Sequence, residues 1–402
     1  MNYKNIDRCR LCGSTELTDV LSLGEQFLAS SFVSTNEGNP LAKSRFPLTL
    51  VLCDRTKNPD ACGLLQLRET VDRDILYREY FYRSATNPMM RAALQEIADE
   101  TQKRAVLEPG DAVIDIGCND GTLLAFFPAS VGRFGIDPAK NIPLREGLDP
   151  SIRIRTDYFS RASADAVSES AQKFKIITSI AMFYDLDDPH AFVSDVKNIL
   201  HPDGIWCIQL SYLPDVLKNM NFYDICHEHL LYYSLTTLRA LLSMHDLTVI
   251  DASVNPVNGG SLRVFVAHKK SGRAISPNVQ RVLGEETAMG LDHAETFRAF
   301  GARIAALKES IVGYLKKEKE RGRMVVGLGA STKGNVLLQY FGIGRDLVPY
   351  LCDRNPEKTG LRTLGTDIEV ISEERMRSSI RRRASQARAA ETISGTNDQG
   401  AD

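Results

Sequence analysis

Apolar residues fall into three successive patterns along this chain. Over residues 1–72 they form short stretches separated by turns, as in 46–52 and 64–67, which predicts small strands. Residues 73–104 carry apolar side chains at helical spacing. Beyond them, apolar strands alternate with helical segments, which is typical of a parallel sheet with helices on both faces. The predicted strands are 112–116, 133–137, 175–180 and 205–210, with helices from about 122 and over 190–200.

The rest of the chain mixes helices with strands and then repeats the strand–turn–helix pattern from residue 324. The further predicted elements are a helix at 235–245, strands at 247–254 and 261–268, a helical region at 277–320, a helix at 332–341, and strands at 348–352 and 368–371. From residue 377 large apolar side chains almost disappear, which predicts a disordered tail. We therefore expect an α/β protein divided into segments 1–72, 73–250, 251–376 and 377–402.

Composition narrows the class of protein. The chain has 402 residues, 43% apolar and 25% charged, so two or three globular domains are expected. Its net charge of −2 gives no basic excess for nucleic acid or an anionic membrane. It has no run of 18 apolar residues, and residues 1–7 have no apolar core, so we expect neither a membrane helix nor a signal peptide. These features predict a cytosolic protein with reduced thiols.

Four of the eight cysteines lie within the first 62 residues. Cys9 and Cys12 form a Cys-x-x-Cys knuckle with Gly13 in its turn, and Cys53 and Cys62 can supply two more thiolates. This set predicts a structural Zn²⁺ site that stabilises a domain whose hydrophobic core is too small to hold it folded. The second pair is separated by eight residues rather than two. Buried structural thiols or a redox pair are therefore the alternatives.

A glycine turn follows the predicted strand 112–116. Gly117 and Gly121 let the backbone approach a ligand, and Asp137 ends the next strand, where an acid can hold ribose hydroxyls. The fingerprint G-x-G-x-x-G is absent, which disfavours NAD here. The turn instead looks like that of an S-adenosylmethionine methyltransferase, and an ordinary α/β turn without a ligand is the alternative. The candidate cofactor residues here are Asp115, Gly117, Asn119, Asp120, Gly121, Asp137 and Asp157.

A histidine-rich block lies at 226–229, with the sequence Cys-His-Glu-His. If the segment is extended, His227 and His229 share one side and Glu228 faces away. Two histidines without a third ligand make a weak metal site, whereas a single histidine can act as a base near neutral pH. A solvated loop is the third interpretation.

A second glycine turn, 327–334, follows a strand and opens a helix. Together with Asp353 at the end of the next strand, it forms a loose dinucleotide fingerprint. Lys333 and the helix N-terminus suit a phosphate group. This turn supports NAD binding as one hypothesis and a Rossmann-like domain without a ligand as another.

Six motifs in order give the chain a specific resemblance over residues 8–376. They are the Cys-x-x-Cys-Gly start, 80–84, 117–121, Tyr-Asp-x-x-His-Glu-His, 258–261 and 329–335. The chain resembles the sugar C-methyltransferase family of deoxysugar pathways. The resemblance implies an N-terminal zinc-binding domain, a central Rossmann-like methyltransferase domain that binds S-adenosylmethionine, and a C-terminal Rossmann-like domain that helps enclose a nucleotide-sugar.

The resemblance also implies the chemistry. The expected substrate is a nucleotide-linked 4-keto-6-deoxy sugar, commonly dTDP-linked, and we expect the chain to be a monomer. The ketone acidifies the neighbouring C–H, a base removes that proton, and the enolate carbon attacks the methyl group of the sulfonium. By resemblance His229 is the base, Glu228 orients or polarises, and His227 is a second candidate.

Further roles follow from the same resemblance. Tyr80 and Tyr82 match tyrosines that line the active site of the family, and Tyr82, Arg83 and Ser84 are candidates for touching the cofactor. The candidates for holding the sugar or its diphosphate are Asn258, Ser261, Arg263 and Lys333.

Three departures from the family pattern stand out. Cys226 replaces a common tyrosine, and 182–185 lacks a common histidine, whose role Tyr184 or Tyr223 would have to take. After 368–371 the chain becomes polar, where the family continues with another apolar strand and an aromatic-rich segment. The C-terminal domain is therefore expected to lack one or two strands and to expose a sheet edge. Two other hypotheses therefore remain: an NAD-dependent nucleotide-sugar oxidoreductase and a non-catalytic nucleotide-sugar-binding relative.

Overall fold

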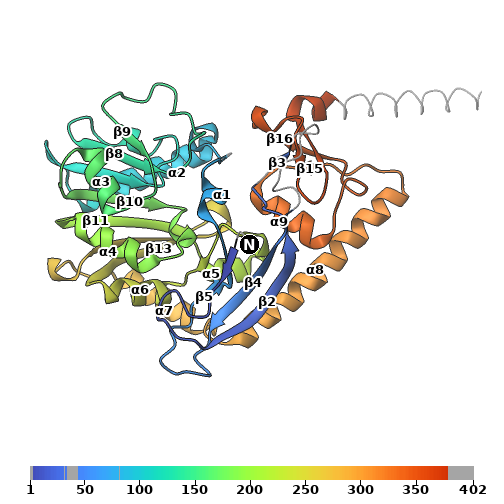
Figure 1. Ribbon diagram of the computed structural model, residues 1–402, viewed down its shortest axis with the longest axis horizontal. Coiled ribbons are helices and arrows are strands. Elements are labelled where there is room, and N and C mark those ends of the chain that lie inside the picture. The colour runs from blue at the N-terminus through green and yellow to red at the C-terminus, as the bar shows by residue number, and fades with distance from the viewer. Residues whose placement is uncertain (1–2, 31, 34–43, 81, 379–402) are drawn as a thin grey trace, which may run out of the picture. The chain divides into compact units, whose positions relative to one another are not determined.

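The computed structural model describes residues 3–30, 32–33, 44–80 and 82–378 (Figure 1). The chain divides into two compact units, the first formed by 1–24 with 46–304 and the second by 25–45 with 305–402. Residues 373–378 are helical, so the first positions of the predicted tail are ordered, and the rest of that tail lies outside the described residues. No helix in the described ranges is long and apolar enough to cross a membrane.

A seven-stranded sheet forms the centre of the first unit, in the order β13-β14-β11-β10-β7-β8-β9. Strands β9, β8, β7, β10 and β11 run parallel, and β14 is antiparallel to both β11 and β13. The strands are β7 (Ala112–Ile116), β8 (Gly132–Asp137), β9 (Arg153–Thr156), β10 (Phe174–Ile180), β11 (Leu200–Ser211), β13 (Leu247–Asn255) and β14 (Ser261–His268). The expected α/β fold is confirmed, with β9 as a strand that the sequence pattern missed.

Helices cover this sheet where their apolar faces are buried. Helix α2 (Pro88–Arg104) begins at Asn87, whose side chain caps the amide of Met89, and its buried residues include Leu94 and Ile97. The helix predicted from about 122 is only a short 3₁₀ turn, Leu124–Phe126, because Pro128 follows and disfavours continued helix. The other helices of this unit include α3 (Arg161–Ser168), α4 (Pro189–Ile199), α5 (Leu213–Lys218), α6 (Leu235–Met244) and α7 (Pro277–Thr287).

The N-terminal strands build a small sheet of their own, in the order β12-β5-β4-β2. Its strands are β2 (Leu17–Gln26), β4 (Phe46–Cys53), β5 (Leu65–Leu67) and β12 (Leu231–Tyr232), and β1 (Tyr3–Asn5) pairs separately with β6 (Glu69–Val71). Strand β12 comes from the segment directly after the histidine block and pairs with β5. The small sheet and the histidine block are thus joined by backbone hydrogen bonds.

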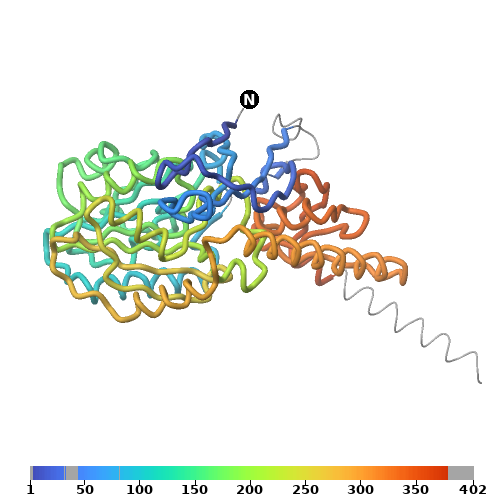
Figure 2. The backbone as a smooth tube through the Cα atoms, turned by 90° about the horizontal axis from the view of Figure 1, so that it is seen from below, coloured from blue at the N-terminus to red at the C-terminus, as the bar shows by residue number. Residues whose placement is uncertain are grey.

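The second unit carries a five-stranded sheet in the order β15-β16-β18-β17-β3. Its strands are β3 (Phe32–Val33), β15 (Gly327–Leu328), β16 (Tyr350–Asp353), β17 (Arg362–Thr363) and β18 (Glu369–Ser372), and helix α9 is Thr332–Phe341. The helical region predicted at 277–320 forms two helices, α7 and α8 (Ala294–Glu320). Strand β3, from the N-terminal part of the chain, pairs with β17, and Figures 1 and 2 show this blue segment beside the red C-terminal strands. Strand β3 therefore belongs to this unit rather than to the small sheet.

The close packing of β8 against the glycine turn gives a test of the fold. A Cβ on Gly135 would lie 2.6 Å from the Cys118 sulfur and 3.0 Å from Leu124, so we expect Gly135→Ala to lower the free energy of unfolding by about 1–3 kcal/mol. Gly284→Ala, in α7 with nothing within 4 Å, should raise it by up to about 1 kcal/mol. Urea unfolding measures both, and equal stability of the two variants would contradict this packing.

Candidate functional site

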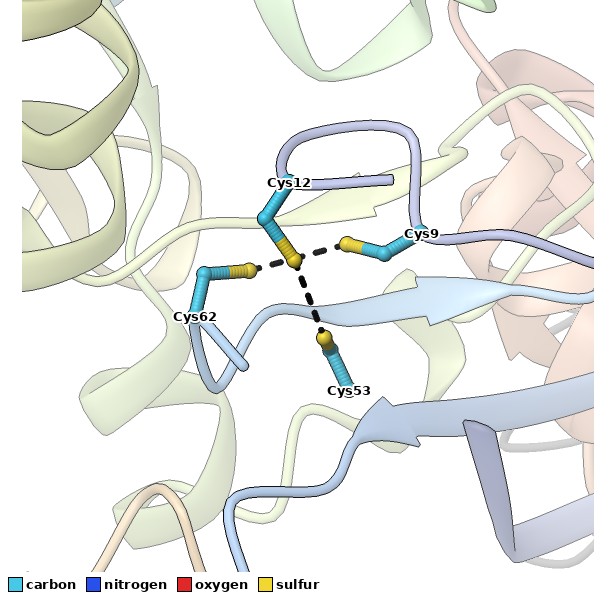
Figure 3. A group of neighbouring side chains, drawn as sticks. All are labelled: Cys9, Cys12, Cys53 and Cys62. Atoms are coloured by element: carbon cyan, nitrogen blue, oxygen red, sulfur yellow. Dashed lines mark hydrogen bonds between the residues drawn. The ribbon is translucent and has the colours of Figure 1, made fainter. Parts of the chain in front are cut away.

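The four N-terminal cysteines come together as one cluster (Figure 3). Their sulfurs all lie within 4.8 Å of one another. The Cys9 and Cys62 sulfurs are 3.6 Å apart and the Cys12 and Cys53 sulfurs 3.4 Å. Four sulfurs at 2.3 Å from one tetrahedral ion would be about 3.8 Å apart, so the cluster has the size of a Zn²⁺ site.

Two turns bring these cysteines together. In the knuckle, Gly13 adopts a φ of 73° and its amide donates to the Cys9 carbonyl at 3.0 Å. In the second turn, Cys53 ends β4 and its amide donates to the Leu64 carbonyl at 2.9 Å. This bond closes the loop that carries Cys62, so the spacing of eight residues still delivers two thiols to one point.

The cluster is electrostatically suited to a cation. Hydrogen bonding with Cys12 lowers the pKa of Cys9 to about 7, and hydrogen bonding with Cys62 lowers the pKa of Cys53 to about 4. Hydrogen bonding with Cys12 raises the pKa of Cys62. Some thiols thus ionise at the expense of another, whereas a divalent cation stabilises all four thiolates together. The Gln66 amide also donates to the Cys9 sulfur at 3.2 Å.

The knuckle is anchored to the central domain through Arg10. Its buried guanidinium donates to the Leu67 carbonyl at 2.6 Å and to Thr70 at 2.7 Å, and it lies 3.4 Å from Asp187. On the other side, His190 at the start of α4 bonds the Leu11 carbonyl at 2.6 Å. The cysteine cluster therefore fixes the small sheet to the loop after β10.

The glycine turn after β7 is held by backbone and carboxylate contacts. The Gly117 amide donates to the Ile136 carbonyl at 2.8 Å, and the Asn119 amide donates to Asp137 Oδ2 at 2.9 Å. Gly117 and Gly121 have φ near 80°, and Asn119, at φ 51°, takes the left-handed backbone that a glycine would adopt easily. An asparagine at this position is thus compatible with the turn.

Asn119 and Asp120 also hold the 82–86 segment in place. The Ser84 amide donates to Asn119 Oδ1 at 3.0 Å, and the Ala85 amide donates to Asp120 Oδ2 at 2.7 Å. The Arg83 guanidinium donates to the carbonyls of Tyr80, Tyr82 and Asn141. Arg83 therefore shapes the loop, Tyr82 remains exposed, and this segment lies over the glycine turn.

The three candidate acids take different positions. Asp137 accepts the amides of Asn119 and Ala139, one on each oxygen, and each oxygen keeps a lone pair for a ribose hydroxyl. Asp115 is buried and accepts from the Thr178 hydroxyl at 2.6 Å, and burial raises the pKa of Asp115 to about 7. Asp157 binds Arg155, and its amide donates to the Asp137 carbonyl. Asp137 thus suits the cofactor best.

The histidine block is a turn rather than an extended segment. The His229 amide donates to the Cys226 carbonyl at 3.1 Å, so the extended conformation in which both histidines would share one side is not adopted. His227 is buried, with Nε2 3.2 Å from the Phe46 carbonyl and its ring edge-on to Phe46. Desolvation lowers the pKa of His227. These contacts give His227 a structural position.

His229 has a different environment. Its Nδ1 lies 2.8 Å from the Asp224 carbonyl, and its ring packs on Tyr184 with centroids 4.3 Å apart. A carbonyl only accepts, so Nδ1 carries the proton and Nε2 is the basic nitrogen of the neutral ring. Tyr223 instead donates to Asn221 at 2.7 Å, which favours Tyr184 over Tyr223 as the tyrosine at this site.

Further titratable groups surround this block. Tyr77 donates to the Glu228 carbonyl at 2.8 Å, and Glu228 itself is buried. Burial, reinforced by the charge of Asp185, raises the pKa of both Tyr77 and Tyr80. Asp185 and Tyr77 were not among the predicted site residues, because a lone acid in a short 3₁₀ turn or a lone tyrosine at the end of α1 (Arg73–Tyr77) gives no sequence signal.

The predicted substrate residues of the first unit are dispersed. Arg263 is buried in β14, where Nε donates to Gln209 and a terminal nitrogen bonds Glu96, both at 2.8 Å. Ser261 donates to the Val257 carbonyl, and Asn258 is exposed at φ 55°. Beside them is an open pocket of about 470 Å³ whose lining includes Asp215, Asn219, Asn255 and Gly260. It lies at the carboxyl edge of the parallel strands, because Ser211 at the end of β11 pairs with Ser261.

In the second unit the turn after β15 repeats the geometry of the first. The Gly329 amide donates to the Cys352 carbonyl, and Asp353 accepts the amides of Ala330 and Asn355. Lys358 lies 3.8 Å from Asp353 and also donates to the Ala330 carbonyl. Lys333 lies in the first turn of α9.

The cysteine cluster predicts one bound Zn²⁺ per chain. We expect Cys53→Ser to lose the metal and to lower the unfolding midpoint, because three thiolates hold the ion less tightly than four. Cys352 is a buried thiol in β16, and the Cys352→Ala variant should keep one full equivalent of Zn²⁺ per chain. Elemental analysis of the purified variants measures this, and full zinc content in Cys53→Ser would refute the site.

The position of Asp137 predicts a cofactor contact. Asp137→Ala should weaken binding of S-adenosylhomocysteine at least about tenfold, because it removes the acceptors for the ribose hydroxyls and releases the Asn119 amide. Asp99→Asn, on the exposed face of α2, is the control. Calorimetry measures both, and equal affinity would contradict this contact.

Comparison with known proteins agrees with these features. Family models match a zinc binding domain at residues 9–77, a methyltransferase domain at 85–252 and a C-methyltransferase C-terminal domain at 256–381. C-methyltransferase NovU of Streptomyces niveus is 30% identical over 92% of this chain and 86% of its own length. A ubiquinone biosynthesis O-methyltransferase of Bordetella avium is 28% identical over 30% of this chain and 48% of its own length.

A solved magnesium protoporphyrin IX methyltransferase of Synechocystis is 12% identical over 45% of this chain and 87% of that chain, with a TM-score of 0.35, too low to support a conclusion. The identity to the Streptomyces protein spans most of both sequences, and the three matched domains follow in the expected order. The chain therefore belongs to the C-methyltransferase family, as a class I S-adenosylmethionine-dependent methyltransferase with an N-terminal zinc-binding domain.

Proposed function

We propose that this enzyme methylates the carbon next to the ketone of a nucleotide-linked 4-keto-6-deoxy sugar, with His229 as the base. The sugar and its expected dTDP carrier rest on the motif resemblance. The observation that carries the role of His229 is the 2.8 Å contact of its Nδ1 with the Asp224 carbonyl. That contact fixes the tautomer in which Nε2 accepts a proton.

The chemistry requires an activated carbon. A ketone acidifies its neighbouring C–H, and removal of that proton gives an enolate whose carbon is nucleophilic. S-adenosylmethionine, when bound, supplies an electrophilic methyl group. Tyr184 packs on the His229 ring and restricts its orientation, while the Asn119–Ser84 contact holds the 82–86 segment over the cofactor turn. Both groups thus keep the reactants in a fixed geometry.

The pocket at the carboxyl edge supports a polar substrate. Asp215 and the amides of Asn219 and Asn255 suit the hydroxyl groups of a sugar, and ligands of open α/β sheets bind at this edge. Helix N-termini such as that of α9, near Lys333, suit a diphosphate. We propose a monomeric enzyme of the cytosol, where the cysteine thiols remain reduced.

Proton exchange tests the role of His229 separately from methyl transfer. In D₂O with dTDP-4-keto-6-deoxy-D-glucose, we expect His229→Ala to lower the exchange rate at the carbon next to the ketone by at least about 100-fold. S-adenosylhomocysteine binding should be unchanged. His201→Ala, at the amino end of β11, is the matched control. Exchange by His229→Ala at the wild-type rate would rule out His229 as the base.

A further inference from the structure

Asp185 follows two residues that contact the cofactor turn and His229, Met182 and Tyr184. It ends a short 3₁₀ turn, Phe183–Asp185, directly after β10. The residue before this turn, Met182, packs on the cofactor turn, because its Cγ would be 2.9 Å from a Cβ placed on Gly117. The Tyr184 ring meets His229 at 4.3 Å. The four residues 182–185 therefore contact both the cofactor turn and His229.

The Asp185 carboxyl has no structural use that accounts for it. Among the described residues, its Oδ1 is enclosed and has no hydrogen-bond partner. The residue as a whole is only partly buried, so part of it remains accessible. An enclosed, unpartnered carboxyl oxygen costs free energy, which a purely structural residue would not retain without compensation.

The surroundings favour the neutral acid. Burial and the charge of Glu228 raise the pKa of Asp185 well above its usual range. No cation contributes to this shift. The titratable groups that interact with it are Glu228, Cys226, Tyr77, Tyr80, Tyr184 and Tyr232, and Tyr184 in turn neighbours Asp224 and His229.

We propose that Asp185 is a catalytic residue that donates a hydrogen bond, as a neutral carboxylic acid, to the ketone oxygen of the substrate while the enolate forms. This inference rests on the proposed function. A carboxylate at the same place would repel the developing negative charge, whereas a neutral acid in a low-dielectric site stabilises it.

The step is balanced without further reagents. The C–H proton passes to Nε2 of His229, and the electron pair moves into the C–C bond and onto the ketone oxygen. Asp185 keeps its proton and shares it in the hydrogen bond. When the enolate carbon forms its bond to the methyl group, the methyl–sulfur bond of the sulfonium breaks and its electron pair stays on sulfur, the ketone is restored, and the imidazolium releases its proton to solvent.

Two variants separate a neutral donor from a charged base. Asp185→Asn keeps a donor of the same shape, so we expect proton exchange with dTDP-4-keto-6-deoxy-D-glucose within about tenfold of wild type. Asp185→Ala removes the donor and should lower the exchange rate by about 100- to 1000-fold. Asp188→Asn, a helix N-cap that asparagine also suits, is the control. A loss in Asp185→Asn as large as in Asp185→Ala, or wild-type exchange in Asp185→Ala, would overturn the proposal.

The pH profile gives a second readout. The donor is present below the pKa of Asp185 and lost above it, so the wild-type exchange rate should fall at high pH. That fall should be weaker in Asp185→Asn, while the fall at low pH, from protonation of His229, should remain. Because Cys226 and Tyr80 also titrate nearby, an equal loss of rate at high pH in the two proteins would assign that loss to them and contradict the proposal.

Infrared spectroscopy needs no substrate. At pH 7 the carbonyl stretch of protonated carboxyls should be stronger in the wild-type protein than in Asp185→Asn, and Asp188→Asn should match wild type; Asp115, with a pKa of about 7, contributes equally to all three. A band of equal intensity in wild type and Asp185→Asn would show an ionised Asp185 and overturn the proposal. A wild-type protein that neither exchanges nor methylates the probe contradicts the proposed function. An active wild type with an equally active Asp185→Ala contradicts only the role of Asp185.

Discussion

The position of the 226–232 segment is the constraint on which the proposed active site depends. The Leu67 amide donates to the Leu230 carbonyl, and the Leu230 amide donates to the Tyr184 carbonyl, both at 2.9 Å. The segment is therefore bonded on one side to the sheet that carries the cysteine cluster and on the other to the loop after β10. Without those two bonds, neither His229 nor Asp185 would have a defined place.

This arrangement gives the metal cluster an indirect part in the chemistry. Four thiolates fix the knuckle and the loop between β4 and β5, and β5 pairs with β12 directly after the histidine block. Arg10 in the same knuckle reaches Asp187, two residues beyond Asp185. A closed, four-sulfur site has no open position for a substrate, so its contribution is to the geometry of the site.

Much of the fold follows from local sequence patterns. The strands before and after Gly117 are apolar runs that end in a glycine and an acid, and these signals act over a few residues. The four cysteines were also identifiable as metal ligands, because the Cys-x-x-Cys spacing of Cys9 and Cys12 is a local signal and two further cysteines lie in the same domain. His227 and Arg263 show where such reasoning fails. Whether a polar side chain faces a site or the core depends on distant partners, Phe46 for His227 and Gln209 and Glu96 for Arg263.

Strand β3 has a consequence for the order of assembly during synthesis. Phe32 and Val33 leave the ribosome early, but their partner β17 begins at Arg362, about 330 residues later. At about 5–20 residues per second, this edge of the sheet stays unpaired for roughly 15–65 s. The nascent chain must therefore keep an open strand from pairing with other chains until β17 has been made.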